Sequence, residues 1–137
     1  LIIHSVSGRN AVPVEMAIEA RKTGVTVVAL TNVKYSKSVT SRHSSGKRLF
    51  EVCDYLLDNC GSIGDTVCKI EGFDQKVAAS STVSGAAILN AILAETVDRV
   101  VKKGLVPPVF ISANMEGGDE HNARILKEYK DNIKYMD

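Results

Sequence analysis

The sequence predicts an α/β fold, a three-layer α-β-α sandwich around a mainly parallel sheet. Two observations support this prediction. Short apolar runs alternate with helical patterns along the 137 residues, which is typical of a parallel sheet covered by helices. Residues 25–30 form a continuous, mainly β-branched run, the pattern of a strand buried on both faces. Because open α/β sheets bind ligands beyond the carboxyl ends of their strands, the loops at those ends are the first candidates for a site.

The first half of the chain predicts two strands, one helix and a long polar loop. Residues 1–4 and 25–30 are the expected strands. The helix between them starts after Asn10, a suitable N-cap, and stops at Gly24, where a left-handed residue is favoured. Residues 31–46 are rich in Ser, Thr, Lys and Arg, and polar loops of this length in compact domains are usually functional or disordered.

The second half predicts shorter elements followed by two helices. The apolar patterns favour a short helix, two strands, one long helix and a final amphipathic helix. Their expected ranges are 47–53, 55–57, 66–70, 83–103 and 120–129.

Composition excludes several classes of protein. With 17 Lys and Arg against 16 Asp and Glu, the chain lacks the basic character typical of nucleic-acid binding. Its longest apolar run, residues 86–94, is far shorter than the roughly 20 residues of a membrane span. The three cysteines lack the spacing of zinc or thioredoxin motifs, so we expect no metal and a cytoplasmic protein with reduced thiols. Nucleotide-binding glycine motifs are also missing from the sequence.

The turn after the first strand is a candidate phosphate site. Ser5 and Ser7 offer two hydroxyls, Gly8 permits close approach of the backbone, and Arg9 supplies charge. Together with Asn10 these residues open a helix, whose free N–H groups suit an anion. The alternative is an ordinary N-capped turn between strand and helix.

A second group of hydroxyls opens the long helix. Ser80, Ser81 and Thr82 repeat the chemistry of the first turn, although Ser and Thr are also the usual helix caps. Because both groups of hydroxyl-bearing residues lie where a ligand is expected, each makes the other a stronger candidate for a phosphate-binding site.

Taken in order, these motifs resemble a SIS (sugar isomerase) domain. The resemblance rests on the Ser-x-Ser-Gly-x-Asn turn, the Thr31-Asn32 strand end with Ser36 beyond it, and the Ser80 helix, over about residues 1–103. Segments 5–15, 35–46 and 117–122 are more closely similar to bacterial SIS proteins labelled as phosphoheptose isomerases.

The resemblance implies a SIS-type, flavodoxin-like fold that binds a sugar phosphate and needs no cofactor. The side chains of Ser5, Ser7 and Asn10 would hold the phosphate, with Asn10 standing where the family usually has Thr. Ser36 and Thr82 would line the same pocket. A homodimer or homotetramer is implied as well.

The resemblance also bears on the extent of the domain. SIS folds normally begin one βα unit earlier, whereas this chain begins with Leu1 inside an expected strand. We therefore expect residues 1–137 to form a single SIS domain that lacks its first βα unit. Residues 105–137 are expected to be a C-terminal extension packing on that domain.

Catalysis is less clearly indicated than binding. The Glu that SIS isomerases and muramic-phosphate etherases carry before the last core helix falls at Gln75 or Lys76, and residues 83–103 contain no His. The remaining candidates for acid–base catalysis are His121, Glu120 and His43. The chain is thus either a sugar-phosphate isomerase, an etherase-like lyase or a phosphosugar-sensing module without catalysis.

Two interpretations of the polar loop that contains His43 stay open. It could close over a phosphosugar with Arg42 or Lys37 as a clamp, or it could be a solvated surface loop.

Overall fold

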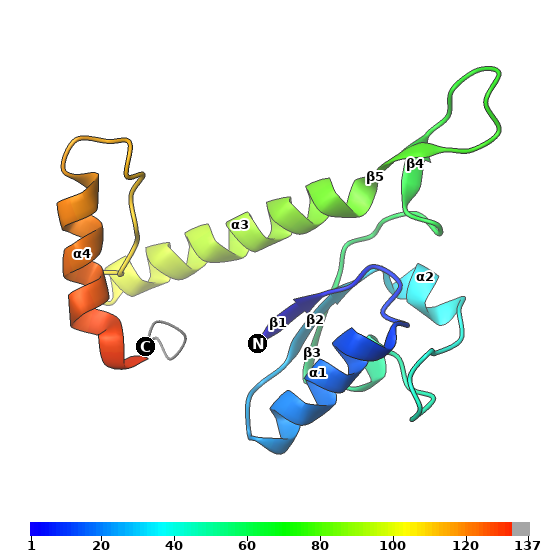
Figure 1. The fold of residues 1–137 in the computed structure, drawn as a ribbon, viewed down its shortest axis with the longest axis horizontal. Helices are drawn as coiled ribbons and strands as arrows, with labels where there is room; N and C mark the ends of the chain where they lie inside the picture. The colour runs from blue at the N-terminus through cyan, green and yellow to red at the C-terminus, as the bar shows by residue number, and fades with distance from the viewer. Residues whose placement is uncertain (133–137) are drawn as a thin grey trace. The chain divides into compact units, whose positions relative to one another are not determined.

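A computed structural model describes residues 1–132 of the chain, which divide into two compact units. The first is Leu1–Ile92 and the second starts at Leu93. A parallel three-stranded sheet of β1 (Ile2–His4), β2 (Val28–Thr31) and β3 (Tyr55–Asp58) lies in the first unit, in the order β1-β2-β3. This sheet, with its helices, confirms the predicted α/β class. Because the three strands are parallel, their carboxyl ends lie at the same end of the sheet (Figure 1).

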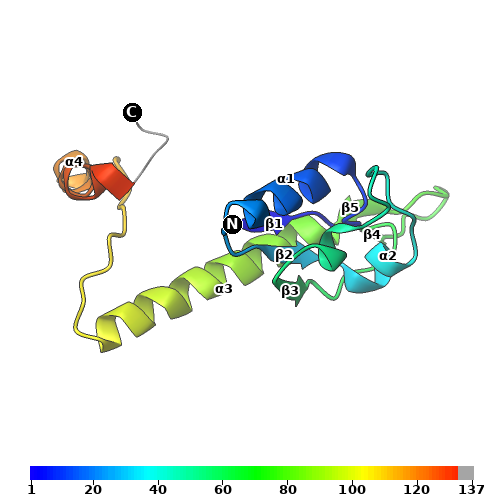
Figure 2. The same cartoon turned by 90° about the horizontal axis from the view of Figure 1, so that it is seen from below.

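Helix α1 (Ala11–Lys22) lies along one face of this sheet (Figure 1 and Figure 2). The predicted limits are correct, since Asn10 is the N-cap residue and Gly24, at φ +80°, follows the last turn. The helix contributes two fully buried side chains to the core of the unit. The core consists of Ile3, Val14, Ala17, Val27, Ala29, Leu49 and Val52.

Strand β2 begins later than the sequence predicts. Its partner β3 starts at Tyr55, opposite Val28, so residues 25–27 have no strand residues of β3 with which to pair. The N–H group of Val27 instead donates to the Asp54 carboxylate at 2.8 Å. Val25 is 43% exposed, so only the later part of the apolar run is buried as expected.

The polar segment 31–46 contains a helix that its sequence pattern did not predict. Helix α2 (Val33–Lys37) is capped by Asn32, whose side chain accepts from the Tyr35 N–H group at 2.8 Å. After it, the Arg48 guanidinium donates to the carbonyls of Ser36 and Val39 at 3.1 Å each. The loop is therefore held by a side chain outside the predicted loop region.

The predicted helix over residues 47–53 is reduced to one 3-10 turn, η1 (Leu49–Glu51). Its capping residue is Arg48, whose N–H group and guanidinium both donate to the Glu51 carboxylate at 2.8 Å. This hydrogen bond and the ion pair lower the pKa of Glu51. Because Leu49 and Val52 must both enter the core, the segment turns sharply after a single turn.

The first unit ends with a hairpin and the start of a long helix. Strands β4 (Thr66–Cys68) and β5 (Val77–Ala79) pair antiparallel. The predicted strand over residues 66–70 is two residues longer than β4, and β5 was not predicted. Helix α3 (Ser80–Lys102) begins at Ser80, three residues earlier than expected, because Asp65, the residue before β4, caps it as described below.

The second unit contains helix α4 (Gly118–Tyr129) and the 3-10 turn η2 (Lys130–Asn132). Gly117, at φ +73°, makes the left-handed turn into α4. Packing of residues 105–137 on the first unit stays a prediction. Within residues 1–132, none of the helices combines the length and apolarity needed to cross a bilayer.

Candidate functional site

Most carbonyl groups of the loop between β1 and α1 accept hydrogen bonds within the first unit. Four consecutive or nearly consecutive carbonyls accept hydrogen bonds from other parts of the first unit or from the loop itself. These bonds are Gly8 N–H to Ser5 O (3.1 Å), Asn32 N–H and Thr31 Oγ1 to Val6 O (2.9 and 2.8 Å), Leu49 N–H to Gly8 O (2.8 Å), and Arg42 N–H to Arg9 O (2.8 Å). The backbone of the loop is thereby fixed with its acceptors occupied.

Several donors of the same loop have no partner in the described part of the chain. Within residues 1–132, neither the N–H groups of Ser7, Arg9 and Asn10 nor the hydroxyls of Ser5 and Ser7 have a protein partner. The first-turn N–H groups of α1 follow directly. We call this set of backbone N–H groups the amide cradle. Unpaired backbone N–H groups at the start of a helix are suited to binding an anion.

Gly8 makes this geometry accessible. It is buried and its φ of +56° lies in the left-handed region, which non-glycine residues rarely adopt. A Cβ atom there would lie 3.0 Å from Ser36 Oγ and 3.2 Å from Leu49 Cβ. Ser36 itself is fully buried, and its Oγ is without a partner in the described part of the chain. Ser36 therefore lies beneath the loop, in contact with Gly8.

Asn10 occupies the N-cap position without capping α1 through its side chain. Its Oδ1 atom instead accepts from Arg42 Nη1 at 3.2 Å. Within residues 1–132 this leaves the N–H groups of Ala11 and Val12 without a cap from Asn10, and it places a guanidinium at the start of the helix. The sequence identified Asn10 as a site residue but could not indicate this partner.

The hydroxyls at the start of α3 have protein partners. Ser80 Oγ donates to the Asp65 carbonyl at 3.0 Å, and Ser81 donates to the Asp65 carboxylate through both its N–H group (2.9 Å) and its hydroxyl (2.7 Å). Thr82 is exposed. The pairing of Thr66 with Ala79 brings Asp65 opposite Ser80. Sequence reasoning missed Asp65, because the cap is separated from its helix by the whole hairpin.

The Asp65 carboxylate is stabilised in its charged form. Burial raises the pKa of this group, but the hydrogen bonds from the side chain and backbone of Ser81 and from Ser80 outweigh burial, so that the pKa lies below its ordinary value. Asp65 also has a φ of +69°, an uncommon conformation for a residue other than glycine.

Replacing Asp65 by alanine should lower the free energy of unfolding by about 1–2 kcal/mol at pH 7, the usual effect of removing a helix cap. Because the folded pKa is depressed, the carboxylate contributes fully above the unfolded pKa of about 4, and the contribution is lost as pH falls through the folded pKa. Urea unfolding from pH 7 to pH 2.5 should show the gap between wild type and variant closing below about pH 4. Asp74→Asn, in the exposed part of the same hairpin, is the control. A gap that stays constant with pH would mean that the charge is not what caps α3.

His43 connects the polar loop to α1. Its side chain is 8% exposed, and Nε2 contacts the Glu15 carboxylate. Nδ1 lies 2.8 Å from Ser45 Oγ and accepts from the Ser45 N–H group at 3.1 Å, which assigns the proton of a neutral ring to Nε2. The hydrogen bond from His43 lowers the pKa of Glu15. Both ring nitrogens are thus engaged.

His121 and Glu120 lie on α4 in the second unit. His121 Nε2 is 3.0 Å from the Val109 carbonyl, and Arg124 Nη2 is 3.3 Å from Nδ1. Asn122 next to it exchanges hydrogen bonds with the backbone of Ile111 at 3.0 and 2.8 Å. The ring of His121 therefore helps to hold residues 109–111 against α4, and Glu120 is exposed. Catalytic roles for both stay predictions.

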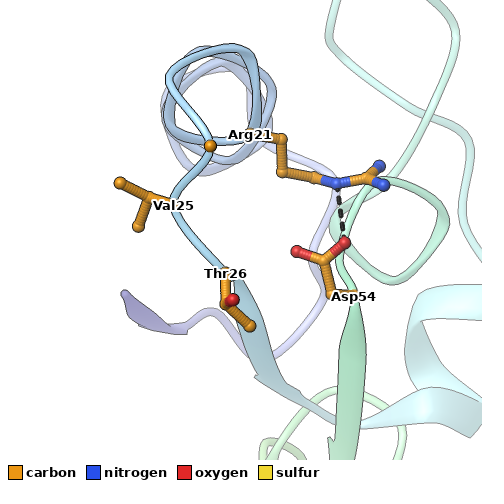
Figure 3. Close-up of a pocket in the computed structure, with 5 residues that line it drawn as sticks. Arg21, Val25, Thr26 and Asp54 are labelled. Atoms are coloured by element: carbon orange, nitrogen blue, oxygen red, sulfur yellow. Dashed lines mark ion pairs between the residues drawn. The ribbon is translucent and has the colours of Figure 1, made fainter.

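A hollow at the opposite, amino-terminal end of the sheet is lined by residues that include Arg21, Val25, Thr26 and Asp54 (Figure 3). The two charged groups face each other across it, with Arg21 Nε 3.0 Å from Asp54 Oδ1. The other carboxylate oxygen of Asp54 accepts from Val27. Both oxygens of the Asp54 carboxylate are therefore occupied, and the ion pair that lines this hollow links the end of α1 to the start of β3. The amide cradle is the better candidate for a ligand site.

Comparison with known proteins relates this geometry to a family. Residues 1–32 match the SIS domain, a range that contains β1, the amide cradle and α1. The chain is also 50% identical over 136 residues to the UPF0309 protein of Shouchella clausii, and 48% identical over 136 residues to that of Oceanobacillus iheyensis. Each match covers 99% of this chain and 55% of the relative.

The UPF0309 protein of Thermoanaerobacter pseudethanolicus is 46% identical over 138 residues, covering 99% of this chain and 56% of that protein. The chain therefore spans about half the length of the relatives it matches. Their names state no activity, so the label of phosphoheptose isomerase has no support from them. The first 32 residues thus match the SIS domain, and the chain is similar over nearly its whole length to the UPF0309 proteins.

Proposed function

We propose that this protein binds a phosphorylated sugar, with the phosphate in the amide cradle. The observation that carries this proposal is how the β1–α1 loop divides its polar groups. Four of its carbonyls accept hydrogen bonds, while the N–H groups of Ser7, Arg9 and Asn10 and the hydroxyls of Ser5 and Ser7 have no partner within residues 1–132. A phosphate group has only acceptor oxygens when fully ionised, so it complements a surface made of donors alone. The SIS-domain match over the same residues supports a phosphosugar as the ligand.

The finer proposal, a sugar-phosphate isomerase of the phosphoheptose type, needs a base next to the sugar. Of the three predicted catalytic residues, His43 is the one that lies in the first unit, and its ring nitrogens are engaged by Glu15 and Ser45. This arrangement favours the alternative of a phosphosugar-sensing protein that binds without turnover. Assaying each bound sugar phosphate for isomerisation distinguishes the two.

A thermal-shift screen tests the binding proposal. Hexose, heptose and amino-sugar phosphates should raise the melting temperature of the purified full chain, and the same sugars without phosphate should not. At a concentration of ten times Kd the stabilisation is about 1.4 kcal/mol, or roughly 3–6 °C. Equal shifts with unphosphorylated sugars would place recognition elsewhere, and no shift with any sugar phosphate would refute the proposal.

A further inference from the structure

We propose that Arg42 clamps the bound phosphate and that Arg42 and Arg9 together select a phosphomonoester dianion over a monoanionic ester of the same shape. This inference rests on the proposed function and adds the charge class of the ligand. Of the two cations that the sequence offered as clamps, only Arg42 is tied to the cradle. Lys37 has no hydrogen bond from its ammonium group within the described residues.

Arg42 is held at the cradle through two contacts at opposite ends of the residue. Its backbone N–H group donates to the Arg9 carbonyl at 2.8 Å, and its Nη1 atom donates to Asn10 Oδ1 at 3.2 Å. Both partners lie in the loop that supplies the free N–H groups. The guanidinium is therefore placed at the N-cap of α1, and its other N–H groups have no partner among residues 1–132, so that they can donate to an oxyanion.

The charge of the two guanidiniums at the cradle is not neutralised by the protein. Elsewhere in the first unit, Arg21 pairs with Asp54 at 3.0 Å and Arg48 with Glu51 at 2.8 Å. Within residues 1–132 neither Arg9 nor Arg42 has a carboxylate partner.

Arg9 is restrained in a similar way. Its Nη2 atom donates to Thr40 Oγ1 at 3.3 Å, and its Nε atom is buried without a partner in the described residues. Two uncompensated positive charges beside a cluster of donors match the two negative charges of a phosphomonoester above its second pKa of about 6. A sulfate ester has the same tetrahedral shape and carries one charge.

The segment that carries Arg42 is ordered before a ligand arrives. His43 is joined to Glu15 on α1, Ser41 Oγ donates to the Lys47 carbonyl at 2.6 Å, and Arg48 holds the carbonyls that precede it. Preorganisation of this kind reduces the entropy lost when the clamp engages an anion. None of these contacts uses the Arg42 guanidinium, so its charge stays available to a ligand.

Methyl phosphate and methyl sulfate are suitable probes because they present the charged group without a sugar. Titrations at pH 8, followed through the amide resonances of Ser7, Arg9 and Asn10, should give wild-type binding at least about tenfold tighter for methyl phosphate. Arg42→Gln should weaken methyl phosphate binding by about 10- to 100-fold, as expected for a charge-assisted contact, and should bring the two probes close together. Arg42→Lys should retain part of the preference, since it keeps the charge but loses the forked geometry.

Arg21→Gln is the matched control, because it removes one positive charge at the other end of the sheet. Its binding of both probes should equal that of wild type. If Arg42→Gln binds methyl phosphate as tightly as wild type while Ser5→Ala/Ser7→Ala loses it, the clamp is refuted and the amide cradle stands. If wild type binds neither probe at these amides, the proposed function fails and the clamp fails with it.

Discussion

Replacing Gly8 by valine should destabilise the protein by about 2–5 kcal/mol and abolish its binding of sugar phosphates. The left-handed backbone costs a non-glycine residue roughly 1–2 kcal/mol. The added side chain would also be forced against Ser36, Leu49 and Thr31, whose atoms lie 3.0–3.3 Å from the position of a Cβ atom, and overpacking of this kind costs about 1–3 kcal/mol. Urea unfolding measures the first effect and a thermal-shift titration with sugar phosphates the second.

Gly46→Val is a matched control for this variant. Gly46 has a similar φ of +70°, but nothing lies within 4 Å of a Cβ atom placed there. The control should therefore show the backbone cost alone and should still bind sugar phosphates. Equal destabilisation of the two variants would contradict the close packing described for Gly8.

The double variant Ser5→Ala/Ser7→Ala should have the opposite profile, with stability unchanged and binding lost. Neither hydroxyl has a protein partner within the described residues, so the folded protein loses no hydrogen bond. A hydrogen bond to a charged group contributes about 1.5–3 kcal/mol, so removal of two should weaken sugar-phosphate binding by about 10²- to 10⁴-fold. Calorimetric titration with the best ligand from the screen, together with urea unfolding, measures both effects.

Ser84→Ala is a control for this double variant, since the Ser84 hydroxyl donates to a backbone carbonyl within α3 at 3.0 Å. It should bind sugar phosphates as wild type does. Undiminished binding by Ser5→Ala/Ser7→Ala would contradict the part assigned to the two hydroxyls and would leave the backbone N–H groups and Arg42 as the proposed phosphate ligands.

The elements that the sequence predicted well are those determined by neighbouring residues. Helix α1 starts after Asn10 and stops before Gly24 because the capping position and the left-handed glycine are local features. The fold class followed from the alternation of strands and helices for the same reason. Strand β5 could not be predicted in this way, since its three exposed residues pair with β4 across a turn and carry no alternating apolar pattern.

The sequence predicted where the candidate site lies, but it did not predict which distant residues contact it. The Ser-x-Ser-Gly turn at a strand end was sufficient to indicate an anion site, because the strand end, the glycine and the helix start are consecutive. The contact between Asn10 and Arg42 spans 32 residues, and Arg48 reaches back 9 to 12 residues to carbonyls of the polar loop. No periodicity or spacing rule indicates such contacts, which depend on the tertiary fold.

The cap on α3 has a consequence for the order of folding. Asp65 and Ser81 are 16 residues apart and meet only when β4 has paired with β5. Helices form in about 0.1–1 μs, whereas hairpins need about 1–10 μs. The slower closure of the hairpin therefore controls when the first turn of α3 gains its cap, and the middle of the helix can form before its beginning is fixed.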